Sequence, residues 1–278
     1  MRFVTYDAGK GPRAGVLSGN AISDAGPGGV DALLRDGGLP GAVADGGSTI
    51  DLADARLLSP VTAPSKIVCM GLNYREHAAE AGLEPPETPT FFAKFPNALA
   101  APGAEVPLPG YSQKVDYEAE VAFVIGRRCK DVPASEALDV IAGYMLLNDL
   151  SARDYQFMTP QWLPGKVFDG SAPCGPALVT PDEAGAHDAI EISLTLNGET
   201  MQSASTADLI HPIPALVEYL SRLMTLEPGD VVATGTPAGV GAAREPRVWL
   251  KEGDEIVISS PQLGVLETKI AAPAGARG

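Results

Sequence analysis

The alternation of apolar and polar positions predicts many short strands with few helices between them. Residues 191–196 alternate and are followed by Asn197-Gly198, the dipeptide typical of a two-residue hairpin turn. Five apolar runs bounded by turn residues predict further strands at 66–72, 117–126, 141–149, 229–237 and 254–270. A turn at 261–264 divides the last of these runs into two strands. Because no strand–helix–strand pattern repeats, we expect the α+β class.

Two segments have helical character. The longer one, 207–226, carries an apolar stripe from its prolines onward at Ile213, Leu216, Leu220 and Leu223. The shorter one, 71–82, has its own start and stop residues. Asn73 is placed to cap its N-terminus, with Glu76 three residues later as in a capping box, and Gly82 suits its end.

The N-terminal part of the chain differs from the rest. Two short strands are predicted at 1–6 and 15–22, with a short helix at 30–37, and this part lacks a dense set of functional side chains. We therefore expect a small N-terminal accessory domain at 1–62 and a larger domain at 63–278, which carries the candidate functional residues.

Composition narrows the class of protein. A formal net charge of -15 argues against nucleic acid and anionic membranes as main partners, because both demand basic surface. The apolar runs are far shorter than the ~20 residues of a membrane helix, and the first residues lack the apolar core of a signal peptide. Three scattered cysteines form neither a disulfide framework nor a zinc motif. A cytoplasmic location is expected.

The first candidate site is a strand rich in acids. Asp116, Glu118 and Glu120 alternate, so in a strand they share one face. Buried carboxylates repel one another and need a counter-charge, which basic side chains or a divalent cation could supply. A solvated edge strand is the alternative interpretation of the same pattern.

A second acid follows an apolar run. If the segment after Asp149 turns helical, Arg153 and Gln156 lie on the same helical face as Asp149. An N-capping acid with an ordinary salt bridge is the alternative. Oxygen ligands without nearby Cys or His favour Mg²⁺ or Mn²⁺ over zinc.

Candidates for proton transfer and substrate binding lie elsewhere in the sequence. His77 and Glu80 are three residues apart on the short helix, close enough for the carboxylate to orient the imidazole as a general base, although a solvated pair would look the same. Lys166, in a Gly/Pro-rich stretch, could neutralise the acids or hold a substrate carbonyl, or be a surface lysine. The loop with Gly235, Thr236 and Gly239 predicts a cradle for a carboxylate.

Seven segments in order resemble the fumarylacetoacetate hydrolase family over about three quarters of the chain. The overall pattern is most similar to the acylpyruvase and 2-hydroxyhepta-2,4-diene-1,7-dioate isomerase branch. Two residues depart from the family pattern. Val167 stands where a small or polar residue is more usual, and Leu150 stands where a valine is more usual. The matching segments are MGLNYREHAAEAG, PTFFAKFPNAL, VDYEAEVAFVIGRRCKDV, AGYMLLNDLSARDYQ, PGKVFDGSAPCGP, GDVVATGTPAGVG and LKEGDEIVI.

The resemblance implies a mixed β-sandwich roll and a homodimer. It implies Mg²⁺ or Mn²⁺ as cofactor and excludes Asp116 as a ligand. The roles that it implies are metal binding by Glu118, Glu120 and Asp149, water activation by His77 and Glu80, enolate stabilisation by Lys166, and substrate binding by Arg153, Gln156 and Thr236.

The expected activity is hydrolysis of a C–C bond in a 2,4-diketo acid of the acylpyruvate or fumarylpyruvate type. Decarboxylation of oxaloacetate-like acids and isomerisation of 2-hydroxy-dienedioates pass through the same kind of enolate, so the sequence leaves them open. A non-catalytic binding protein with the same fold is the alternative from another class.

Overall fold

The computed structural model describes residues 1–39 and 48–273 of the chain. Its strands are β1 (Arg2–Asp7), β2 (Arg13–Ser18), β3 (Ala21–Pro27), β4 (Thr49–Asp51), β5 (Arg56–Leu57), β6 (Ile67–Gly71), β7 (Thr90–Lys94), β8 (Leu99–Ala100), β9 (Glu105–Pro107), β10 (Val115–Asp116), β11 (Ala119–Ile125), β12 (Ile141–Asn148), β13 (Ser151–Ala152), β14 (Ala172–Val179), β15 (Glu191–Leu196), β16 (Glu199–Ser205), β17 (Val231–Ala233), β18 (Glu255–Ser260) and β19 (Gly264–Ala271). Its α-helices are α1 (Gly29–Arg35), α2 (Arg75–Glu80), α3 (Arg153–Gln156), α4 (Pro181–Ala184) and α5 (Ile213–Leu223). Strands therefore dominate, as the α+β prediction requires.

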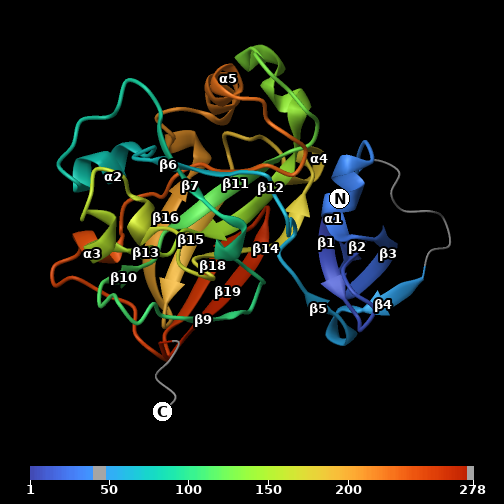
Figure 1. Ribbon diagram of the computed structural model, residues 1–278, viewed down its shortest axis with the longest axis horizontal. Helices are drawn as coiled ribbons and strands as arrows, with labels where there is room; N and C mark the ends of the chain where they lie inside the picture. The colour runs from blue at the N-terminus through green and yellow to red at the C-terminus, as the bar shows by residue number, and fades with distance from the viewer. Residues whose placement is uncertain (40–47, 274–278) are drawn as a thin grey trace.

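Two sheets pack face to face around the main core (Figure 1). The larger one follows the order β4-β3-β2-β1-β14-β12-β11-β17-β6-β7, and the smaller one the order β16-β15-β18-β19-β9. Parallel and antiparallel neighbours both occur, since β17 pairs with β6 in parallel while β11 pairs with β12 antiparallel. The structure thus confirms the mixed β-sandwich that the family resemblance implies.

Burial on both faces explains why the central strands are apolar throughout. On β11, Val121 and Phe123 belong to the core between the two sheets, whereas Ala122 and Val124 belong to a second core on the opposite face. Alternating side chains point to opposite faces of a sheet. With both faces covered, these strands lose the polar alternation of a half-exposed strand.

The hairpin and helix predictions are confirmed in outline. Asn197 and Gly198 join β15 to β16 with φ angles of 52° and 83°, the positive values that a type I′ turn requires. The long helix is α5, which begins only at Ile213. Leu216 and Leu220 are buried in its apolar stripe, whereas Leu223 at its last turn is 55% exposed.

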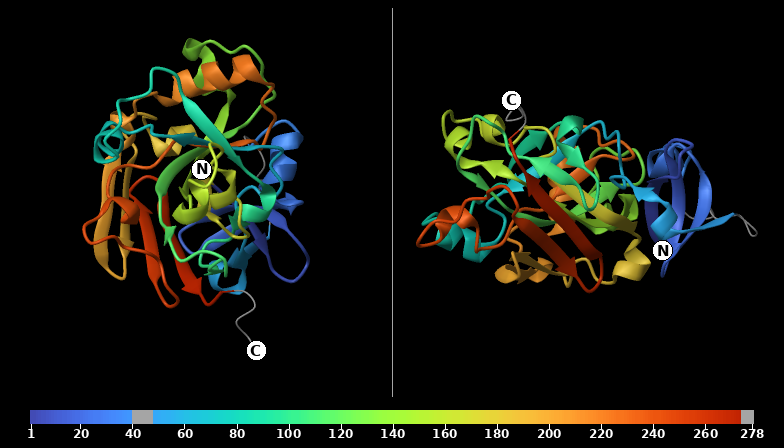
Figure 2. Two further views of the ribbon diagram at one scale, coloured as in Figure 1. Left: turned by 60° about the vertical axis from the view of Figure 1, so that its left-hand side comes forward. Right: turned by 90° about the horizontal axis from the view of Figure 1, so that it is seen from below.

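The N-terminal strands lie at one end of the molecule (Figures 1 and 2). They extend the larger sheet because β1 pairs with β14, and Phe3 and Leu34 share a core cluster with β6 and β12. The single strand predicted at 15–22 is wrong: Gly19 and Asn20 form a turn between β2 and β3. A domain boundary at residue 62 stays a prediction.

Two further sequence expectations concern the whole chain. Cys69, Cys129 and Cys174 are free and buried, as expected for a chain without a disulfide framework. Among the described residues, no helix combines the length and apolar character needed to cross a bilayer.

Candidate active site

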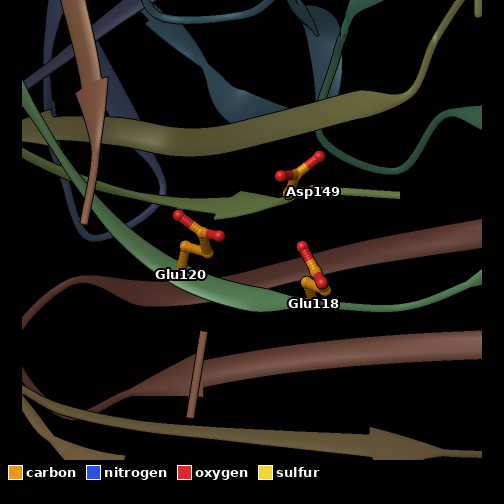
Figure 3. A group of neighbouring side chains, drawn as sticks. All are labelled: Glu118, Glu120 and Asp149. Carbon is orange, nitrogen blue, oxygen red and sulfur yellow. The ribbon is translucent and has the colours of Figure 1, made fainter. Parts of the chain in front are cut away.

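Three carboxylates converge where β11 begins and β12 ends (Figure 3). Glu118 precedes β11, Glu120 lies on it, and Asp149 follows β12. The register that places Ala119 opposite Asn148 continues outward through a 2.9 Å bond from the Asp149 amide to the Glu118 carbonyl. One oxygen from each carboxylate lies within 4.8 Å of the others. Antiparallel pairing therefore joins acids that are about thirty positions apart in sequence.

Burial excludes the solvated edge strand as an interpretation. Glu118 is 5% exposed, Glu120 1% and Asp149 0%. Carboxylates this far from water need hydrogen bonds or opposite charges. The three carboxylates therefore form a buried polar site inside the protein, and not a solvated edge.

Asp116 departs from the predicted common face. The strand is interrupted after Asp116 and resumes at Ala119, so the simple alternation from 116 to 120 is wrong. Asp116 instead accepts bonds from the amides of Gly241 and Ala242, at 2.8 and 3.0 Å, and from Nε of Arg153 at 2.9 Å. It anchors the arginine beside the three carboxylates.

Basic side chains surround two of the three carboxylates. Nζ of Lys166 lies 2.6 Å from Glu118 and 2.8 Å from Asp149. Nη2 of Arg153 lies 2.8 Å from the other oxygen of Glu118. Lys166 is 2% exposed, so the surface-lysine alternative is excluded.

Lys94 is a site residue that sequence reasoning missed. Its Nζ lies 2.8 Å from Oδ1 of Asp149, and both side chains are buried. Lys166 therefore shares the neutralisation of the acids with a second lysine. A lysine within the apolar run Phe91-Phe92-Ala93-Lys94 was the available signal, because a charge there must be buried with a partner.

Glu120 has a different environment from its neighbours. Its Oε2 accepts a 2.8 Å bond from the Gly235 amide, but no basic group of the described chain lies within 4 Å of it. Burial, followed by the negative charges of Asp149 and Glu118, raises the pKa of Glu120 well above its ordinary value.

The pKa shifts of Glu118 and Lys166 both favour the charged form, unlike that of Glu120. Burial alone would raise the pKa of Glu118, but the charges of Arg153 and Lys166 outweigh burial and lower it. Burial alone would lower the pKa of Lys166, but Asp149 and Glu118 raise it. Glu118 and Lys166 are thus held ionised, and Glu120 is the carboxylate that still needs a cation.

The donor set fits a hard divalent cation. Three buried carboxylates supply oxygen ligands, and one of them lacks an ion-pair partner in the described chain. Mg²⁺ and Mn²⁺ prefer such oxygen ligands, whereas zinc favours nitrogen and sulfur. Glu118, Glu120 and Asp149 would hold the ion.

The short helix α2 carries His77 and Glu80 at hydrogen-bonding distance. Nδ1 of His77 lies 3.2 Å from Oε2 of Glu80, whose other oxygen accepts a 2.9 Å bond from the Gly239 amide. Burial alone would raise the pKa of Glu80, but the bonds from His77 and Gly239 lower it. The carboxylate therefore stays ionised beside the imidazole.

The predicted capping box of α2 is wrong. The helix begins at Arg75, and neither Asn73 nor Glu76 caps it. The Asn73 amide instead donates to the carbonyls of Thr234 and His211, at 2.8 and 3.1 Å, and accepts from the His211 amide at 2.8 Å. These tertiary hydrogen bonds tie the segment before α2 to Thr234, which follows β17, and to His211, which precedes α5.

Arg153 and Gln156 form their own one-turn helix, α3. Asp149 is not on this helix, because β13 intervenes, so the predicted shared helical face is wrong for the acid. The N-cap alternative is wrong too, since the N-cap residue is Ala152. Nη1 of Arg153 donates to Gln156 at 2.9 Å, which aligns the two side chains.

The glycine-rich loop after β17 contributes Thr236. The amides of Gly235 and Gly239 do bind carboxylates, as predicted, but these belong to the protein itself, to Glu120 and Glu80. The Thr236 hydroxyl accepts a 2.9 Å bond from Gln202, so its own proton is free to point elsewhere. Gln202, on β16, is a second residue that sequence reasoning missed; a lone polar residue in a strand gave little indication.

A cavity of about 310 Å³ joins these groups. Eight of the nine predicted site residues line it, whereas Asp149 is fully buried and does not. The eight are His77, Glu80, Glu118, Glu120, Arg153, Gln156, Lys166 and Thr236. His187 and His211 do not line it, and Nε2 of His211 lies 2.9 Å from the Pro86 carbonyl.

Comparison with known proteins adds family and reaction names. The fumarylacetoacetate (FAA) hydrolase C-terminal family model matches residues 66–271. The mitochondrial oxaloacetate tautomerase FAHD2A of Bos taurus is 38% identical over 292 residues, covering 97% of this chain and 91% of that protein.

Two similar solved structures have other reaction names. The 5-carboxymethyl-2-hydroxymuconate delta-isomerase of Mycobacterium smegmatis is 35% identical with a TM-score of 0.83, covering 99% of this chain and 100% of that one. The maleylpyruvate hydrolase of Sphingobium sp. SYK-6 is 32% identical with a TM-score of 0.82, covering 98% and 100%. The similar proteins thus include a tautomerase, an isomerase and a hydrolase.

Proposed function

The chain belongs to the fumarylacetoacetate hydrolase family, and on this premise we propose that it hydrolyses a C–C bond in small 2,4-dioxo carboxylic acids, such as acylpyruvates. The observation that carries the proposal is the position of His77 and Glu80 on the same cavity as Glu118 and Glu120. Hydrolysis needs a water-activating base beside the acidic site, and the position of His77 supports that role.

Glu118, Glu120 and Asp149 are the proposed ligands of Mg²⁺ or Mn²⁺. When bound, the cation supplies Lewis-acid stabilisation of the negative charge that develops on the 2-oxo group. Lys166 supports the same charge, because its ammonium lies between Glu118 and Asp149 at the cavity wall.

His77 is the proposed general base. It takes a proton from water, whose oxygen attacks the 4-carbonyl carbon, and Glu80 holds the imidazole in place through Nδ1. The bond between C3 and C4 then breaks, and its electron pair passes to the pyruvate enolate. The proton that His77 took from water passes to C3 and completes pyruvate, and the distal part leaves as a carboxylic acid.

Arg153, Gln156 and Thr236 are the proposed substrate-binding residues. All three line the cavity beside the carboxylates. Arg153 is held by Asp116, and Thr236 by Gln202, so both present fixed donors to a substrate carboxylate or carbonyl.

Tautomerisation of an oxo acid is the second candidate. The Bos taurus relative, which carries that reaction name, supports it, and the Mycobacterium smegmatis isomerase supports a proton shift of the same kind. Decarboxylation of an oxaloacetate-like acid uses the same enolate. These reactions need no attacking water, so they differ from hydrolysis in their demand on His77.

A turnover screen separates the candidates. The Mg²⁺-loaded enzyme is assayed with acetylpyruvate, fumarylpyruvate, oxaloacetate and a 2-hydroxy-dienedioate. We expect diketo acids to be hydrolysed, and His77→Ala to lose this activity by about 10²-fold or more. His187→Ala is the matched control, since His187 does not line the cavity. Equal loss of every activity in His77→Ala would count against the assigned role.

The enzyme assignment has its own test. Full, chelator-insensitive turnover by a Glu118→Gln and Glu120→Gln double variant would refute the metal-dependent mechanism. Binding of oxo acids without turnover of any of them would favour the non-catalytic alternative. The homodimer and the cytoplasmic location stay predictions, which gel filtration with light scattering and cell fractionation can address.

A further inference from the structure

The cavity is lined by charged side chains at its inner end and by apolar side chains near its opening. Its inner wall carries Glu118, Glu120 and Lys166, all nearly fully buried. Its outer wall includes Leu83 and Phe157, whose exposed fractions of 52% and 68% place them where the cavity opens to solvent. The apolar wall also includes Leu72, Phe92, Trp162 and Val240.

The lysine and arginine side chains that line the cavity are buried beside the acids. Among the described residues that line the cavity, Arg153 and Lys166 are the two side chains of lysine or arginine type. Arg153 is paired with Asp116 and Glu118, and Lys166 with Glu118 and Asp149. A second carboxylate at the distal end of a substrate would meet apolar walls instead of a cation, and it would lose its hydration uncompensated.

The remaining titratable pair reinforces this asymmetry. His77 and Glu80 also line the cavity and are partly exposed, and the Glu80 carboxylate is paired with the imidazole and the Gly239 amide. The pKa of Glu80 is lowered, so this side chain is negative at neutral pH. It repels a distal carboxylate and leaves an apolar group unaffected.

The charge balance of the inner part points the same way. Counting each acid as ionised, the buried cluster is net negative by one, and a 2+ ion on the proposed ligands brings it to one positive charge. One carboxylate matches that charge, whereas two exceed it. The cluster comprises the acids Asp116, Glu118, Glu120 and Asp149 and the bases Lys94, Arg153 and Lys166.

We propose that this enzyme selects 2-oxo monocarboxylates with an apolar distal group over dicarboxylates of equal length. The inference rests on the proposed function, since it assumes that the 2-oxo acid end lies at the carboxylate trio. It goes beyond that function by making oxaloacetate a poor ligand, as it carries a second carboxylate, and an acylpyruvate with an alkyl or aryl end a good one.

A matched ligand pair tests the proposal without catalysis. 5-Methyl-2-oxohexanoate and 2-oxoglutarate share one head group, and an isopropyl group in the first replaces a carboxylate of similar shape in the second. Neither has a 4-oxo group, so neither can be cleaved in the proposed hydrolysis. Isothermal titration of the Mg²⁺-loaded protein is expected to show about tenfold or tighter binding of the branched acid.

A variant provides a second, independent readout. Leu83→Lys places a cation at the opening, and the position is exposed enough to accept it. We expect it to strengthen 2-oxoglutarate binding by about fivefold or more relative to Leu138→Lys, an equally charged control at an exposed leucine that does not line the cavity.

The outcomes distinguish this proposal from the function on which it rests. Mg²⁺-dependent binding of both acids with equal affinity, or tighter binding of 2-oxoglutarate, overturns the selectivity alone. Equal effects of Leu83→Lys and Leu138→Lys also overturn it. Binding of both acids that is absent or independent of Mg²⁺ overturns the proposed function together with the selectivity.

Discussion

Nζ of Lys94 lies 2.8 Å from Oδ1 of Asp149, and both side chains are completely buried. The lysine stands at the end of β7 and the aspartate follows β12, so the pair joins two distant strands of the larger sheet. Lys94 also donates to the carbonyls of Leu150 and Ser171, at 3.3 and 2.9 Å. It thereby fixes the backbone around one of the proposed metal ligands.

Replacing Lys94 should therefore destabilise the protein strongly. Lys94→Met removes one of the two ammonium groups that pair with Asp149 and leaves the buried Leu150 carbonyl without the lysine donor, so we expect the free energy of unfolding to fall by about 3–5 kcal/mol. Urea denaturation of the metal-free protein measures the loss. Lys269→Met is the control, because its pair with Glu255 is exposed and should contribute about 1 kcal/mol or less. Equal effects of the two substitutions would contradict the structural role of Lys94.

Replacing Glu120 should have different effects on stability without and with metal. Its buried carboxylate lacks an ion-pair partner in the described chain, so Glu120→Gln should leave the metal-free protein as stable as before or more so. The same variant should lose most of the stabilisation by Mg²⁺, which for wild type is about 2.7 kcal/mol at a concentration 100 times the Kd.

Thermal unfolding with Mg²⁺ and with a chelator measures both effects. Glu267→Gln, on the exposed side of β19, serves as the control and should keep the full response to Mg²⁺. An undiminished response in Glu120→Gln would show that the ion binds elsewhere.

Asn73 should matter for the position of α2. Its side chain makes three hydrogen bonds to Thr234 and His211, and it is 1% exposed. Asn73→Ala leaves these backbone groups unpaired, at a cost of about 1–3 kcal/mol for each buried group. Glu76→Ala is the control, since Glu76 caps nothing in the structure. If the predicted capping box existed, the two variants would lose similar stability.

Acid should loosen α2 through Glu80. Because its pKa is lowered in the folded state, the stabilisation from Glu80 is complete above about pH 4.3, the ordinary glutamate value, and is lost as the pH falls through the lower folded value. The contacts at risk are those with His77 and the Gly239 amide.

Hydrogen exchange followed by mass spectrometry measures this opening. Protection of the α2 amides, relative to those of α5, should decrease between about pH 6 and about pH 3.5. In Glu80→Gln the relative protection of α2 should be lower at both pH values and change little between them. A wild-type α2 whose relative protection is constant over this range would contradict the assignment.

Local patterns anticipated much of the fold and most of the site. Alternation predicted the β15–β16 hairpin, because Asn197 and Gly198 accept positive φ with little strain. The ordered motifs pointed to nine residues, eight of which line one cavity. Local reasoning failed at Asn73, whose side chain was assigned to the nearest helix end and instead binds partners 138 and 161 positions away.

The sequence by itself determined which chemistry is available: three carboxylates for a hard cation, a histidine with its carboxylate neighbour, and strands apolar enough to be buried on both faces. Only the tertiary structure decided how the charges are paired. It separates Asp116 from the other acids, brings Lys94 to Asp149, and leaves Glu120 without a counter-charge in the described chain. Sheet register and burial set these relationships, and both depend on residues far apart in the chain.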